Sequence, residues 1–157
     1  MAKPRQKRPN SAKPRPDRPI PLHWAILIPA ITTILLNLPR LSLGYFWDDF
    51  LFLTGRGHGP AAFLTPDPNA AFYRPLSQGL YFLVLKIFDP ANGLLGHCVN
   101  LAGLIAAISL VVLLVSDLAG RRAGLLAGLV FAGYGHVASL VAWISSDQDL
   151  FAIIFVL

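Results

Sequence analysis

Long apolar runs constrain this chain most. They cover residues 22–38, 94–115 and 123–144, and residues 150–157 begin a fourth run. Uncharged stretches of about 20 residues are long enough to cross a bilayer as helices, although the first is near the lower limit. Only 13% of the residues are charged, against about 25% in soluble domains. The sequence therefore predicts an all-α, polytopic membrane protein with three complete spans and the start of a fourth.

Residues 1–21 form a basic, proline-rich tail before the first run. This segment holds seven of the thirteen Lys and Arg residues and six prolines. Proline at that density blocks helices and there is no apolar surface to bury, so we expect a disordered tail. A basic flank to a first span is far commoner than a nucleic-acid-binding tail, and no nucleic-acid partner is expected. The bilayer is the expected partner, with the N-terminus in the cytoplasm of a multi-pass protein of the cell (inner) membrane.

Residues 44–93 predict a long first loop, rich in Gly, Pro and aromatic residues. Within it, residues 76–88 are apolar but would measure only about 20 Å as a helix. We expect this helix to lie in the membrane interface, because the hydrocarbon core is about 30 Å thick. The tail and Arg121-Arg122 then share the cytoplasmic side, and the first loop is extracytoplasmic. If residues 76–88 span instead, the basic residues divide less unevenly between the two sides.

The acidic residues suggest where chemistry would occur. Asp48 and Asp49 stand side by side between aromatic residues, and one of them is a candidate general base. The alternative is an aspartate pair in the first turn of a helix. Asp147 and Asp149 would orient an acceptor, a donor or a cation, or would cap the fourth span. Arg74 would bind a phosphate group or extend to lipid headgroups.

Other polar positions favour structural roles. His97 and Asn100 share a face of the second span, a pattern typical of interhelical hydrogen bonding. Gly124, Gly128 and Ala132 form a stripe of small residues for close helix packing. The single cysteine excludes an intrachain disulfide. Carboxylate oxygens would suit a divalent cation, but no His/Cys cluster accompanies them, so we assign no metal and no other cofactor.

Four motifs follow one another in a familiar order: Phe46-Trp47-Asp48-Asp49-Phe50, Tyr73-Arg74-Pro75-Leu76-Ser77, His97-Cys98-Val99-Asn100 and Val141-Ala142-Trp143-Ile144-Ser145. From about residue 22 onward the chain resembles the N-terminal part of GT-C-fold membrane glycosyltransferases. The dolichyl-phosphate-mannose–protein mannosyltransferase-like proteins that carry tetratricopeptide repeats are the most similar type. The chain departs from the family pattern at Leu104, Tyr134-Gly135 and Asp147, where a histidine, a His-Pro pair and an arginine are expected.

The resemblance implies a transferase that moves a sugar from a polyprenyl-phosphate donor to a hydroxyl of a protein, glycan or lipid acceptor on the extracytoplasmic face. It places the catalytic carboxylates at Asp48 and Asp49. Substrate contacts are expected from Arg74, Tyr73, His97 and Asp149. Since residues 150–157 are too short to span a bilayer, we expect a truncated fragment of such an enzyme. The alternative is a non-catalytic polytopic protein or inactive remnant that acts through contacts of the small-residue stripe.

Overall fold

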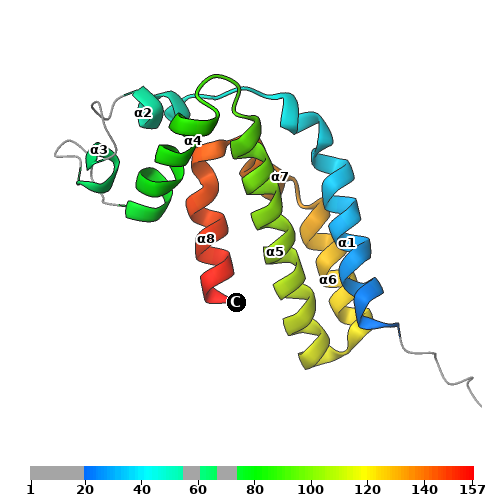
Figure 1. Cartoon of the computed structure of the whole chain (residues 1–157). Coiled ribbons are helices and arrows are strands. Elements are labelled where there is room, and N and C mark those ends of the chain that lie inside the picture. Colours follow the sequence, from blue (N-terminus) through cyan, green and yellow to red (C-terminus); the bar gives the residue numbers. More distant parts are fainter. Residues whose placement is uncertain (1–19, 55–60, 67–73) are drawn as a thin grey trace, which may run out of the picture.

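The computed structural model describes residues 20–54, 61–66 and 74–157. Nearly all of the tail at 1–21 and the predicted substrate residue Tyr73 lie outside these ranges. Every secondary-structure element in the described part of the chain is helical, which confirms the all-α prediction. The elements run from α1 to α8, with the short helical turns η1, η2 and η3 between them (Figure 1).

Two helices are long and apolar enough to cross a membrane. The first is α1 (Leu22–Asn37), which continues into η1 (Leu38–Ser42), and the second is α5 (Leu94–Ala119). These helices confirm the first two predicted spans and indicate a membrane-associated protein. Large apolar side chains remain exposed along both of them, as expected of surfaces that face lipid.

The predicted third span is not one straight helix. The chain forms α6 (Arg121–Gly133) and α7 (Gly135–Ala142), which are bent by 60° at Tyr134. Tyr134 has an extended backbone, and a glycine on either side of it weakens the helix there. Three complete spans are therefore not confirmed: the described residues contain two span candidates, or three if the bent pair counts as one. α8 (Asp147–Val156) follows the short turn η3 (Ile144–Ser146).

The small-residue stripe packs inside the chain. Helices α1, α5 and α6 lie side by side, and α8 lies along α5 (Figure 1). A Cβ atom added to Gly124 would stand 2.7 Å from the carbonyl oxygen of Val112, and one added to Gly128 would stand 2.9 Å from the ring of Pro29. Both distances are too short for a side chain, so these glycines let α6 approach α5 and α1 closely. The packing prediction is confirmed, and the stripe is already covered by the chain's own helices.

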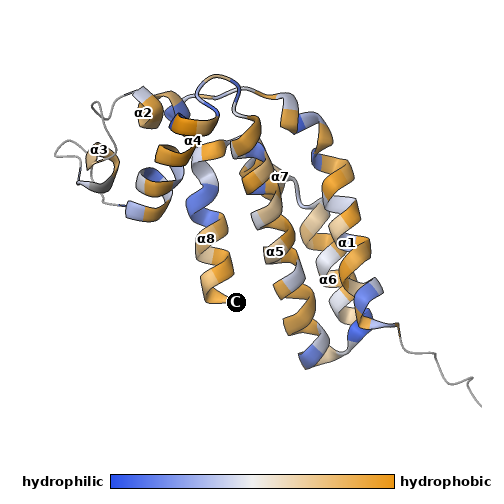
Figure 2. Ribbon diagram, in the orientation of Figure 1, coloured by the Kyte–Doolittle hydropathy of each residue, from blue (hydrophilic) through white to orange (hydrophobic). Residues whose placement is uncertain are grey.

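The predicted long loop contains helices. They are α2 (Asp48–Thr54), α3 (Ala61–Leu64), η2 (Pro75–Tyr81) and α4 (Phe82–Phe88). The last two form one short apolar helix, so the helix predicted at 76–88 is present although the long loop is not confirmed. These elements gather at one end of the long helices (Figure 1). In Figure 2 hydrophilic residues gather at the turn between α5 and α6, at the beginning of α8 and among the elements of the first loop.

Two hydrophobic clusters hold these parts together. The larger lies between the long helices, and the smaller lies under the first loop and fastens α2, α3 and the short helix to η3. The smaller cluster comprises Tyr45, Leu53, Phe63, Tyr81, Phe82, Leu85 and Ile144. The candidate site is built where this smaller cluster meets the break between α7 and α8.

Candidate functional site

Asp49 ties the first loop to the break between α7 and α8. Its side chain is fully buried. One carboxylate oxygen accepts a hydrogen bond of 2.9 Å from the Phe46 N–H, and the other accepts one of 2.8 Å from the Ser145 N–H. Phe46 precedes α2 and Ser145 lies in the first turn of η3, positions where backbone N–H groups have no partner within a helix. The carboxylate therefore holds together two segments that are almost a hundred residues apart.

A left-handed residue turns the chain into this arrangement. Trp47 has φ +49°, and it is the one described residue other than glycine with a positive φ. This backbone conformation costs about 1–3 kcal/mol and is found mostly where the surrounding structure enforces it. The Phe46 and Trp47 rings stack on the outside with centroids 5.9 Å apart, while the aspartates begin α2. The strain thus lies immediately before the carboxylate pair.

The two neighbouring aspartates differ in environment. Burial raises the pKa of the Asp49 carboxyl, while its two backbone hydrogen bonds and the nearby His97 act in the opposite direction. Asp48 is partly exposed. Asp48 is therefore the carboxylate of the pair that a substrate can reach, and Asp49 is the one that the fold uses as a link.

A second aspartate is buried at the beginning of α8. Asp147 is only 2% exposed, and neither of its carboxylate oxygens has a hydrogen-bond partner among the described residues. Its pKa is raised to about 7, chiefly by burial; the charges of Asp49 and Asp149 act in the same direction, whereas the Gln148 N–H and the Arg74 cation act in the opposite one. Asp149, the residue expected to contact substrate, is exposed in the same helical turn. No side chain caps α8 by a hydrogen bond, so the capping alternative holds only as an interaction with the helix dipole.

Arg74 lies against the same turn of α8. Its guanidinium donates a hydrogen bond to the side-chain oxygen of Gln148, the neighbour of Asp147. The Arg74 side chain is partly buried. Arg74, Asp49 and Asp147 are thus brought together from three separate parts of the chain. From the sequence we expected only that Arg74 and the two aspartate pairs lie on the same side of the membrane.

His97 and Asn100 stabilise the broken end of α7. His97 Nδ1 lies 2.7 Å from the Val141 carbonyl oxygen, which accepts the N–H of that nitrogen. The Asn100 amide donates to the carbonyl oxygens of Leu140, at 2.9 Å, and Ile144, at 3.1 Å. The carbonyls of Leu140 and Val141 lie in the last turn of α7, where no following turn bonds them, and Ile144 begins η3. The interhelical role predicted for this pair is confirmed, and the fully buried His97 faces the helix end instead of an open site.

The hydroxyl groups of Tyr81 and Tyr45 also form hydrogen bonds in this part of the molecule. The Tyr81 hydroxyl donates to Asn100 Oδ1 at 2.8 Å, and the Tyr45 hydroxyl donates to the Asp89 carbonyl oxygen at 2.5 Å. Burial and the charges of Asp89 and Asp49 raise the pKa of Tyr45 to about 12. The Asp89 carboxylate accepts the Leu95 N–H at 2.7 Å, which caps α5. Both tyrosines were absent from the predicted site, because an aromatic residue in an apolar segment carries no signal of its hydroxyl's partner.

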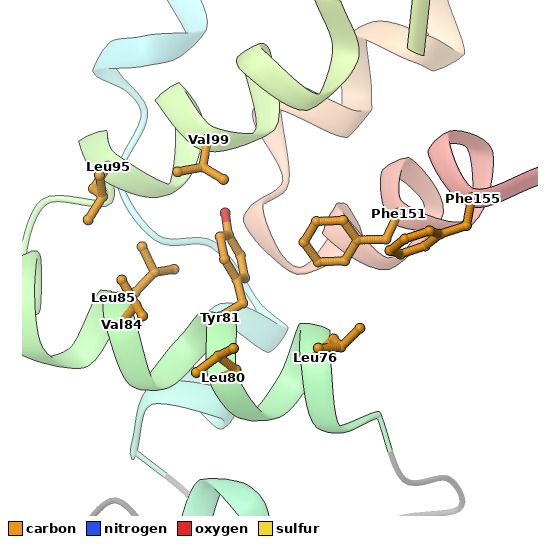
Figure 3. A pocket seen from close by; sticks show the side chains of 9 residues that line it. All are labelled: Leu76, Leu80, Tyr81, Val84, Leu85, Leu95, Val99, Phe151 and Phe155. Carbon is orange, nitrogen blue, oxygen red and sulfur yellow. The ribbon is translucent and has the colours of Figure 1, made fainter. Parts of the chain in front are cut away.

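An apolar groove opens beside these polar groups. It has a volume of 390 Å³ and lies between η2–α4, α5 and α8, with the side chain of Tyr81 reaching across it toward α5 (Figure 3). Its lining consists of Leu76, Leu80, Tyr81, Val84, Leu85, Leu95, Val99, Phe151 and Phe155. Phe151 lies one helical turn after Asp147, so the groove begins where the charged groups end.

A second cavity of 480 Å³ lies between the segment before α2 and the end of α7. Its lining includes Tyr45, Phe46 and Trp143. Across the described ranges, no group of three or more His, Cys, Asp and Glu side chains is arranged to hold a metal, and a divalent cation stays an untested possibility. Comparison with known proteins found no match to this chain, neither a family model nor a curated protein nor a solved structure.

Proposed function

We propose that this chain is a membrane glycosyltransferase that moves a sugar from a polyprenyl-phosphate carrier to an acceptor hydroxyl on the extracytoplasmic face. One observation carries the proposal: Arg74 and Asp49 both bind residues 145–148, at the end of an apolar groove. A cation beside a long apolar groove matches a substrate that has an anionic phosphate and a hydrocarbon tail. The resemblance of the four motifs to GT-C enzymes supports the same substrate class.

The donor would lie along the groove. A volume of 390 Å³ is within the range of about 300–1,000 Å³ that small-ligand sites occupy, and the lining is apolar as an isoprenoid tail requires. The phosphate would then bind the Arg74 guanidinium, whose planar set of donors suits phosphate oxygens. Arg74 would also stabilise the negative charge that develops on the departing phosphate.

The reaction needs one base. The acceptor hydroxyl attacks the anomeric carbon, the bond between that carbon and the phosphate oxygen breaks, and the configuration at the carbon inverts. The hydroxyl proton passes to Asp48, the partly exposed member of the pair. Asp49 would act as a positioning residue, because its two backbone hydrogen bonds hold the beginning of α2 in place. The acceptor would enter through the second cavity, where Phe46 and Trp143 offer aromatic faces for a sugar or a peptide.

Transfer assays with the whole chain in lipid vesicles test this function. The donor is radiolabelled polyprenyl-phosphate mannose, and the product is labelled acceptor. Asp48→Asn should lower turnover about 10²- to 10⁴-fold, the contribution of a positioned base. Asp117→Asn is the matched control, since this aspartate is exposed near the opposite end of α5. Unchanged transfer in both Asp48→Asn and Asp49→Asn would refute the proposal, as would the absence of transfer by the wild-type chain from any polyprenyl-phosphate hexose.

The same proposal assigns an orientation. The bent pair α6–α7 would count as the third span and residues 150–157 as the start of a fourth, in the cell (inner) membrane. The tail and Arg121 would then lie in the cytoplasm, with the α2 end outside. Cysteines introduced at Phe50 and Arg121, in a Cys98→Ser chain, should react with an impermeant reagent from opposite sides. Labelling of both from one side would contradict this topology.

A further inference from the structure

Asp147 is an unusual carboxylate for a membrane protein of this size. It is almost completely buried, and both of its oxygens are without a hydrogen-bond partner among the described residues. Buried carboxylates are normally hydrogen-bonded or paired, because an isolated negative charge is costly in a medium of low polarity. A proton on Asp147 removes that cost, so the protonation of this group depends on the charges that surround it.

The surrounding charges come from four elements. Asp49 of α2 and Asp149 of α8 are negative neighbours of Asp147, and the charge of Asp147 also acts on the Tyr81 hydroxyl of η2. His97 of α5 lies next to Asp49. Arg74 is the positive neighbour, and its guanidinium donates to the side chain of Gln148, the residue that follows Asp147. Arg74 is therefore the cation that favours an ionised Asp147.

We propose that Asp147 takes up a proton when the phosphate of a lipid-linked substrate binds Arg74, so that phosphate binding and proton uptake are coupled. The inference rests on the proposed function, which places the phosphate at Arg74. A bound phosphate offsets the charge of the guanidinium and adds a negative charge near Asp147. Both effects favour the neutral carboxyl, since a carboxylate and a phosphate would otherwise compete for one cation.

The proton balance is simple. The Asp147 carboxylate and one proton from the solvent give a carboxyl group, and no bond of the sugar or the phosphate changes in this step. By thermodynamic linkage, binding that favours the protonated form must be tighter when Asp147 is protonated. A tenfold coupling, on the order of one pKa unit, would give an uptake of about half a proton per bound phosphate between the two Asp147 pKa values.

Calorimetry with methyl farnesyl phosphate tests the coupling. This phosphodiester carries one negative charge that does not titrate near neutral pH. Binding to the whole chain in uncharged detergent is measured in two buffers of different ionisation enthalpy, which yields the number of protons taken up. We expect proton uptake by the wild-type chain and an affinity that falls about tenfold from pH 6 to pH 9. Asp147→Asn should bind without this uptake and with nearly constant affinity, while Asp117→Asn should behave as the wild type.

Further measurements separate the possible failures. The infrared carbonyl band of the protonated Asp147 carboxyl group should change with pH in the wild-type chain without ligand. This band should be missing from the spectrum of Asp147→Asn. If Asp147→Asn takes up as many protons as the wild type, the coupling to Asp147 is wrong. If Arg74→Gln weakens binding but the wild type takes up no proton, only the coupling fails. If Arg74→Gln binds the phosphodiester as tightly as the wild type, or the wild type does not bind it, the phosphate site of the proposed function fails as well.

Discussion

Replacement of Asp49 by Asn tests whether this carboxylate connects two segments of the fold or acts in catalysis. The Asn side chain keeps one acceptor oxygen and replaces the other by an NH₂ group. One of the two backbone donors, the Phe46 N–H or the Ser145 N–H, then faces a second donor. Leaving a buried N–H without a partner costs about 1–3 kcal/mol. Asn also removes a buried charge, and since burial of that charge raises the pKa of Asp49, its removal offsets part of this cost.

Hydrogen exchange at the break between α7 and α8 measures this cost. A loss of about 1–3 kcal/mol corresponds to a local opening that is roughly 5- to 150-fold more frequent, so the Ser145 amide of Asp49→Asn should exchange faster by that factor. Asp48→Asn makes the same chemical change one residue earlier, at a partly exposed position. Its Ser145 amide should exchange at the wild-type rate. Equal exchange in the two variants would refute the assignment of the link to Asp49.

Three further outcomes follow from burial and packing. The pKa of Asp147 is raised to about 7, so its carboxyl group stabilises the fold most below about pH 4, and this stability is lost as the pH rises to 7. In thermal unfolding at pH 8, Asp147→Asn should therefore be more stable than the wild type. Gly128→Ala places a Cβ 2.5 Å from Val112 and should cost about 1–3 kcal/mol, whereas Gly133→Ala, with nothing within 4 Å, should unfold at the wild-type temperature. Asn100→Ala removes the bonds to the Leu140 and Ile144 carbonyls and should cost about 0.6–1.7 kcal/mol in a denaturation series within lipid.

The sequence predicted the helices correctly where the length and hydropathy of a segment alone decide its structure. The run at 94–115 is long and uncharged, so its helix was evident, and the apolar segment at 76–88 was too short for a span. The bend at Tyr134 was missed. Gly133 and Gly135 weaken the helix around Tyr134, but the bend itself is seen only in the structure, where α7 packs against α5 and η1. α3 was also missed, and α2 was expected only as the alternative for Asp48 and Asp49, since the Gly, Pro and aromatic composition of this segment is that of a loop.

The sequence by itself determined that this chain is helical, that two of its helices can cross a membrane, and that glycines at 124 and 128 allow close packing. It also placed the acidic residues in two pairs, Asp48–Asp49 and Asp147–Asp149. Only the tertiary structure decided which member of each pair is buried. The two aspartates of a pair have nearly the same local sequence, and their burial depends on partners from distant parts of the chain: Ser145 for Asp49, and Asp49 and Arg74 for Asp147. Charge placement in this protein is a long-range property, because a buried carboxylate is tolerated only where other segments bring a donor, a cation or a proton to it.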